Sequence, residues 1–177
     1  MPQALGIQAD ISTQIRNAII ETIQEDSYFI SILQDSKAID LISRLNSDII
    51  VYRCPLDKII LRKYPAISVF CGEQRFNAQG TQSNGQFTEY DIYIDCAVQS
   101  SDINTLQDLL FNLIKSVMIT VYSVNLCSTS YPTGTVARWV WDKIETFGDF
   151  FQEGSFWTQM ARLKITAYNI EGVGWFG

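Results

Sequence analysis

The sequence predicts a single α+β domain spanning residues 1–177, in which a mainly antiparallel sheet of about four to six strands is packed by a long helix and by N-terminal helices. The first observation is composition: 47% of the 177 residues are hydrophobic and 18% are charged, which provides apolar surface for one core. The second is periodicity, because helical spacing and strict alternation occur in separate segments. The third is continuity, since no internal repeat, linker or low-complexity block divides the chain.

The first third of the chain carries helical patterns followed by extended ones. Asp10 can cap a helix whose apolar residues, from Ile11 to Ile23, recur at three- and four-residue spacing. A second, shorter helical pattern covers residues 38–45. Extended runs come next, and strands are predicted over residues 49–52, 58–62 and 66–71.

The middle of the chain predicts a hairpin. Residues 72–87 are polar and contain several glycines, so we expect a long mobile loop that has too little apolar surface to pack by itself. Residues 90–98 alternate and predict a strand with one buried face. Its other face carries Glu89, Asp91 and Asp95. These carboxylates could form an acid/base pair or a cation site, but the ordinary exposure of Asp and Glu favours a solvated, acidic face.

Ser101 and Asp102 open the longest predicted helix, whose apolar stripe reaches Val121. A turn-rich segment then leads to two further strands, predicted over residues 136–141 and 156–170. Residues 171–177 are predicted to form a flexible tail. The tail carries two large aromatic side chains, Trp175 and Phe176. We expect them to dock either on the same subunit or on a neighbour.

Composition argues against several classes of function. The absence of histidine removes Ser-His and Cys-His nucleophile pairs and histidine-ligated zinc. The formal net charge of −6 argues against sequence-independent binding to a phosphate backbone. The N-terminal residues do not resemble a secretory signal, so the thiols are expected to be reduced and mostly buried. The four cysteines are Cys54, Cys71, Cys96 and Cys127, and no two of them form a Cys-x-x-Cys pair. The sequence therefore predicts neither an enzyme nor a cofactor or metal site.

A second acidic group lies close to the predicted strand at residues 136–141. Its spacing does not match a calcium loop, which needs closely alternating oxygen ligands and a glycine at the bend. A charged surface is the plain interpretation, and a negative field that repels a polyanion is the sharper one. Its members are Asp142, Glu145, Asp149 and Glu153.

Taken together, these patterns resemble the tail terminator proteins of long-tailed bacteriophages. The likeness rests on the N-terminal amphipathic helix, the Tyr-Pro-Ala-Ile-Ser-Val segment at residues 64–69, the polar loop, the alternating strand, the long helix opened by Ser101 and Asp102, and two closing strands. The resemblance implies a small structural subunit of the virion that forms a ring, most often a hexamer. Such a ring caps the tail tube, stops its polymerisation and joins the tail to the head connector.

The resemblance also implies partners and a location. The partners would be other copies of the chain, the tail tube protein, a sheath protein in contractile tails, and a neck or connector protein. DNA would pass through the ring without specific binding, and no membrane would be involved. The protein would be assembled in the host cytoplasm and would reside in the tail or neck of the virion.

Two sets of candidate residues follow from this expectation. Partner contacts are expected from the polar loop and the tail, at Arg75, Phe76, Phe87, Trp175 and Phe176. At least one acidic group is expected to line the channel, because a negative wall lets DNA slide. The candidates are Glu89, Asp91 and Asp95 in the first group, and Asp142, Glu145, Asp149 and Glu153 in the second.

Three alternatives stay open at the level of the sequence. The first is another neck protein, such as a stopper or a head–tail adaptor. The second is a monomeric ligand-binding module, which predicts a pocket near Trp139 and Trp141. The third, and the least favoured, is an enzyme that uses carboxylates only.

Overall fold

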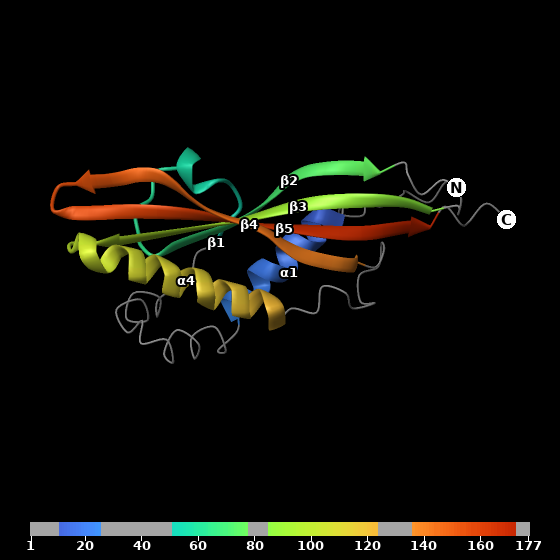
Figure 1. Ribbon diagram of the computed structural model, residues 1–177, viewed down its shortest axis with the longest axis horizontal. Helices are drawn as coiled ribbons and strands as arrows, with labels where there is room; N and C mark the ends of the chain where they lie inside the picture. Colours follow the sequence, from blue (N-terminus) through green and yellow to red (C-terminus); the bar gives the residue numbers. More distant parts are fainter. Residues whose placement is uncertain (1–10, 26–50, 78–84, 124–135, 173–177) are drawn as a thin grey trace, which may run out of the picture.

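The computed structural model describes residues 11–25, 51–77, 85–123 and 136–172. These residues form one five-stranded sheet and two helices, which confirms the predicted α+β class (Figure 1). The helices are α1 (Ile11–Glu25) and α4 (Ile103–Ser123), and a short 3-10 helix, η1, covers Leu56–Lys58. The strands are β1 (Val51–Tyr52), β2 (Ala66–Asn77), β3 (Gly85–Ser100), β4 (Val136–Glu153) and β5 (Phe156–Gly172).

The sheet has the strand order β1-β2-β3-β5-β4. The short strand β1 runs parallel to β2, and every other neighbouring pair is antiparallel. The central pair is β3 and β5, whose register continues without a shift from Gly85 opposite Gly172 to Ser100 opposite Trp157. The long strands twist strongly, so the two halves of the sheet face different directions in Figure 1.

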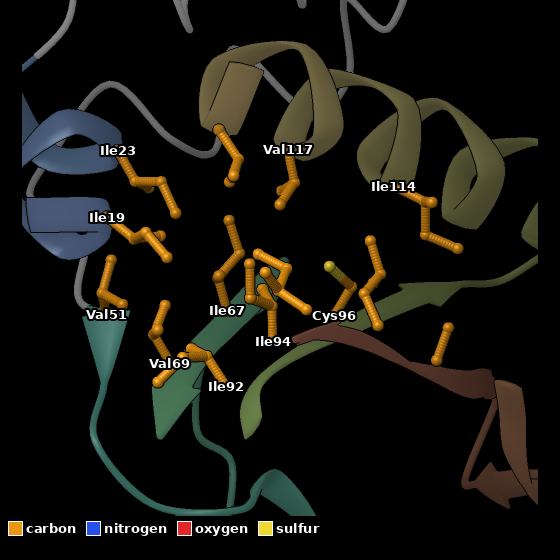
Figure 2. Packing of buried hydrophobic residues seen from close by; sticks show 14 of the residues in the cluster. Ile19, Ile23, Val51, Ile67, Val69, Ile92, Ile94, Cys96, Ile114 and Val117 are labelled. Carbon is orange, nitrogen blue, oxygen red and sulfur yellow. The ribbon is translucent and has the colours of Figure 1, made fainter. Parts of the chain in front are cut away.

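Both helices lie on one face of the sheet and enclose the main core (Figure 2). The helix α4 packs on β3 and β5, and α1 packs on β2 and also contacts α4. Their apolar stripes meet the inward residues of the strands, as the side chains of Ile19, Ile94 and Val117 show. Each such aliphatic side chain stabilises the fold by roughly 1.5–3 kcal/mol through its burial.

The opposite face of the sheet is covered in part by the chain between β1 and β2. In η1, Leu56 is fully buried and packs with Ala66 and Ala97 in a second, small apolar cluster. The side chain of Met160, from β5, packs against the same cluster. The region predicted as a strand at residues 58–62 is instead the end of a 3-10 turn followed by irregular chain. Ile59 and Leu61 pack against the small cluster on the sheet face, whereas Ile60 is 91% exposed.

Several predicted boundaries change in the structure. The loop predicted over residues 72–87 is shorter, since residues 72–77 belong to β2 and residues 85–87 to β3. Backbone pairing across the hairpin, from Gln74 opposite Tyr90 to Asn77 opposite Phe87, holds these residues in the sheet, and residues 78–84 lie outside the described part. The strand predicted to end at residue 141 continues to Glu153. The predicted tail begins later, because residues 171 and 172 pair with β3.

Other predictions fall on parts of the chain that the structure does not describe. These are the second helical pattern at residues 38–45, the turn-rich segment at residues 127–134, and residues 173–177 of the tail. The helical layer described is therefore made of α1 and α4.

Candidate functional site

The face of the sheet opposite the helices carries a charged network, which is the candidate functional site. Because side chains alternate along a strand, the carboxylates of β3 and the cations of β5 both point to this face. The antiparallel register then sets Asp95 opposite Arg162 and Tyr93 opposite Lys164. On the outer side of β5, Glu145 of β4 also lies opposite Arg162.

Asp95 and Arg162 form a bidentate ion pair in this network. The Arg162 Nε and Nη2 atoms donate to the two carboxylate oxygens at 2.6 and 2.8 Å, and the Asp95 side chain is 0% exposed. The backbone N–H of Leu56 donates to the same carboxylate at 3.0 Å. The hydrogen bond to Asp95 raises the pKa of Arg162 above its ordinary value. This geometry satisfies the buried charge, as a bidentate guanidinium does best.

Arg162 also contacts groups beyond Asp95. Its Nη2 atom lies 3.3 Å from Asp57 Oδ1, on η1. Its guanidinium carbon lies 5.1 Å from the centre of the Phe70 ring and 5.8 Å from that of Tyr93. These two rings stack with their centres 5.5 Å apart. One side chain therefore joins β5 to β3, to β2 and to the segment that covers the sheet.

Asp91 is the second buried carboxylate on this face. Its Oδ1 atom accepts from Arg75 Nη2 at 2.9 Å and from Thr166 Oγ1 at 3.2 Å, and Lys164 Nζ lies 3.2 Å from Oδ2. Lys164 Nζ also lies 2.8 Å from Asp142 Oδ2 on β4. The hydrogen bond to Asp142 raises the pKa of Lys164, and the same bond lowers the pKa of Asp142. The charge of Asp91 raises the pKa of Arg75.

The outer edge of this face is more open. The side chains of Asp142 and Glu145 are 48% and 49% exposed, and Glu145 forms an ion pair with Lys143. A depression of about 260 Å³ lies between β4 and the ion pairs of β5. Its lining combines both signs of charge with one aromatic ring: Tyr93, Asp142, Lys143, Glu145, Arg162 and Lys164. Because its cations are already paired with carboxylates, this arrangement is suited to holding strands in register rather than to activating a nucleophile.

The structure corrects the prediction of a solvated acidic face on β3. Asp91 and Asp95 are 2% and 0% exposed, and each is neutralised by cations. Glu89 is 23% exposed at its side chain and pairs with Arg75 at 3.2 Å. Asp91 and Asp95 therefore do not form the exposed negative wall that was predicted for them. The cause is tertiary: partners such as Arg162, far along the chain, cover the carboxylates.

The other predicted site residues have different outcomes. Asp142 and Glu145 are exposed on β4, whereas the side chains of Asp149 and Glu153, on the same strand, are not described. Arg75 lies on β2 rather than in a loop, with its side chain 45% exposed. Phe76 and Phe87, also predicted as partner contacts, lie on β2 and β3, and the structure does not describe their side chains. Trp175 and Phe176 lie outside the described residues.

Sequence reasoning missed Arg162 and Lys164 as the centre of this face. A signal for them exists in the sequence, because Arg162, Lys164 and Thr166 alternate along the last strand just as the carboxylates do along β3. Two polar faces of opposite sign on a pair of antiparallel strands predict cross-strand ion pairs. The signal could not be used without knowing that these two strands are neighbours.

An aromatic group lies on the other side of β4. Trp139 and Trp141 are half-buried against the main core, with ring centres 6.0 Å apart. Tyr122, at the end of α4, is 62% exposed and has its ring 5.2 Å from that of Trp139. The two tryptophans thus extend the core toward the sheet edge, on the opposite face from the depression described above.

The cysteines within the described segments are free. Cys96 is buried in the main core, and burial raises the pKa of its thiol. Cys54 and Cys71 are half-buried, and Cys127 lies outside the described residues. In the described part of the chain no three acidic or cysteine side chains gather as metal ligands. No helix there combines the length and hydropathy that crossing a membrane requires.

Comparison with known proteins shows a likeness of fold. No protein-family model matches the sequence, and neither does any curated protein. Among solved structures, the fold is similar to that of a chain from the virion of a native gene transfer agent (GTA) particle, with a TM-score of 0.50 and 10% sequence identity. The match covers 93% of this chain and 100% of that chain. At this identity the likeness establishes a shared fold.

Proposed function

We propose that this protein is a structural component of a phage-like virion, and more specifically a tail terminator. In this role it forms a ring, most simply a hexamer, that caps the tail tube and stops its polymerisation. The ring then joins the tail to the neck or head connector and leaves a channel for DNA. The observation that carries the proposal is the shared fold with a chain of the GTA virion, which extends over 93% of this chain and the whole of that one.

The charged face supports a structural role over a catalytic one. Asp91 and Asp95 are held by arginine and lysine side chains, so neither is available as a general acid or base within the described network. Their ion pairs join β2, β3, β5 and β4 into one rigid layer. A subunit that transmits load between a head and a tail benefits from such a layer, because it resists sliding of the strands.

The channel proposal now rests on β4. Asp142 and Glu145 keep about half of their side-chain surface exposed, and Asp149 and Glu153 follow on the same strand. A wall of this charge would repel phosphate and let DNA pass without holding it. Asp91 and Asp95 cannot line such a channel, because they are buried within the protomer.

The oligomer is tested by native mass spectrometry and negative-stain imaging of the protein, alone and mixed with its tail tube protein. We expect closed rings, six subunits in the simplest case, in at least the mixture. Monomers under both conditions contradict the ring.

The terminator function is tested by assembling the tube protein with and without this chain. Tubes that stop growing and carry a ring at one end are the expected result. Tubes that grow equally in both reactions contradict the terminator function. A ring that instead binds the head connector and leaves the tubes unaffected identifies a stopper or adaptor of the neck.

A further inference from the structure

Both lateral edges of the sheet are open in the described part of the chain. Strand β1 pairs with Ile67 and Ser68, so the outer edge of β2 continues beyond it from Val69 to Asn77. At the opposite edge, β4 pairs with β5 on one side, and no described strand pairs with its other side. Open edges present unpaired backbone N–H and C=O groups that can pair with another chain.

The strand directions suit the joining of these two edges. Strand β2 is antiparallel to β3, β3 to β5, and β5 to β4, so β4 runs opposite to β2 within the sheet. If a second copy sets its β2 beside β4 with its helices on the same side, the new pair is antiparallel. Ten strands then form one continuous sheet, in which each new contact repeats the pairing that dominates the protomer.

The two sides of the sheet carry opposite net charge. On the β2 side the charge lies in the chain that leads from β1 to the start of β2: residues 51–65 contain four basic residues and one acidic residue, a net of +3, and β2 itself contains one of each. Strand β4, residues 136–153, contains two basic and four acidic residues, a net of −2. Charge on an edge strand discourages pairing between identical edges, because like charges repel. The basic chain beside the start of β2 and the acidic strand β4 have opposite charges, which favour contact between this side of one copy and β4 of the next.

The shape of β4 limits the contact to a short stretch. Its pairing with β5 shifts register at three places, and Lys143–Phe147 is a regular segment between two of them. In this segment Ile144 lies opposite the buried Leu163 and therefore faces the helix side, where it is 45% exposed. The residues of β2 on the same side, such as Val69 and Cys71, belong to the core or pack against it. A neighbouring β2 beside β4 would cover Ile144 with apolar surface.

We propose that a second copy of this chain docks head-to-tail, with its β2 edge against the β4 edge of the first. The contact is heterologous, so repeating it generates a closed ring or an open chain according to the angle between successive copies. Closure into a ring rests on the function proposed above, whereas the edge contact itself does not.

A charge exchange tests the contact. The first variant, Glu145→Lys with Thr146→Lys, makes β4 basic, and both positions are exposed. The second variant, Arg53→Glu with Lys63→Glu, makes the β1–β2 segment acidic, and both of these side chains are also exposed. Each variant then has two edges of the same sign. We expect each one alone to need at least about tenfold higher concentration to assemble than the wild type.

An equimolar mixture of the two variants restores opposite charges at every contact. We expect the mixture to assemble at the wild-type concentration, with both variants present in equal number in each particle by native mass spectrometry. A matched control places the same charge change on α4, through Gln107→Lys with Asp108→Lys, at two exposed positions away from both edges. This control should assemble like the wild type.

Each outcome separates the contact from the ring. If the wild type forms rings and both variants form them equally well alone, the edge contact is wrong and the ring stands. If the wild type forms open chains that each variant loses and the mixture restores, the contact stands and the ring is wrong. Variants that lose assembly without rescue in the mixture overturn head-to-tail docking, and a monomeric wild type overturns both. If circular dichroism shows that either variant is unfolded, the single variants Glu145→Gln and Arg53→Gln are used instead. The proposed contact then predicts that each of them assembles more weakly than the wild type and that its assembly depends less on salt concentration.

Discussion

At the scale of single residues, Arg162 has the largest role in the charged face. Its guanidinium forms the bidentate pair with Asp95, approaches Asp57 and lies over the stacked rings of Phe70 and Tyr93. Removing one partner of a buried ion pair leaves a charge without compensation, and this costs more than the intact pair contributes. The fold therefore needs Arg162 in order to neutralise the buried Asp95. Only a change of both residues together is expected to leave the fold stable.

Substitution of Arg162 by leucine tests this requirement. We expect Arg162→Leu to lower the free energy of unfolding by about 3–5 kcal/mol, since Asp95 stays buried and loses its cation. The double variant Asp95→Asn with Arg162→Leu removes the charge as well and should recover a large part of the loss. Urea unfolding followed by circular dichroism measures all of these values. The matched control is Lys143→Leu, because the Lys143 side chain is 55% exposed. Loss of its exposed ion pair should lower the free energy of unfolding by less than about 1 kcal/mol. A single variant as stable as this control contradicts the assigned role.

At the scale of elements, the β4–β5 hairpin shows how a turn and a shift of register together place the residues of the candidate site. Glu153 pairs with Phe156, so Gly154 and Ser155 form a two-residue turn, and Gly154 has a φ of 63°. The register that starts at this turn reaches Phe151 opposite Thr158, and continued unchanged it would set Glu145 opposite Lys164. The irregularity between Phe147 and Phe151 shifts the pairing by two positions and brings Glu145 opposite Arg162. The strand predicted over residues 136–141 is shorter than β4, because the alternation of apolar residues breaks where the pairing shifts register between Trp141 and Lys143.

Substitution of Gly154 tests the turn. A Cβ atom at this position meets nothing within 4 Å, so the cost of Gly154→Ala comes from the left-handed backbone itself. We expect that variant to lose about 1–2 kcal/mol of unfolding free energy. Asparagine tolerates the left-handed region better, and Gly154→Asn should lose less. Equal stability of the alanine variant and the wild type would show that the turn adopts another conformation in solution.

At the scale of the whole molecule, the sheet separates two kinds of interaction. The helix side is an apolar core, and the other side is held by ion pairs that link four strands. The ion pairs titrate at both ends of the pH range. The hydrogen bond from Lys164 lowers the pKa of Asp142, and Lys58 with Arg162 lowers that of Asp57 although burial opposes this shift. The hydrogen bond to Asp142 raises the pKa of Lys164.

These directions predict a stability that falls in acid and in strong alkali. A carboxyl whose pKa is lowered by folding stabilises the protein above its unfolded pKa of about 3.9, and this stabilisation is lost as the pH falls through the lower, folded value. Lys164 stabilises below its unfolded pKa of about 10.4, and its contribution is lost as the pH rises through the raised value. Urea midpoints measured from pH 2 to pH 11 should show both declines. Asp142→Asn should flatten the acid decline, and an unchanged acid decline in this variant would exclude Asp142 as one of its causes.

The sequence by itself determined the elements whose patterns are local. The stripes that predicted α1 and α4 are the residues that the core buries, such as Ile19 and Val117. The strand at residues 90–98 likewise lies within β3, with the predicted face buried. These predictions succeeded because periodicity in a helix or strand is a property of neighbouring residues and needs no knowledge of the partner element.

Only the tertiary structure decided the nature of the candidate site. Asp95 and Arg162 are 67 positions apart, and their contact depends on β5 lying between β3 and β4 in the sheet. The same alternation that correctly placed Asp91 and Asp95 away from the core could not tell whether water or cations would meet them. A carboxylate is solvated where nothing covers it and buried where a guanidinium replaces its water, and strand order makes that choice. The open edges of β2 and β4 likewise follow from strand order, which no local pattern specifies.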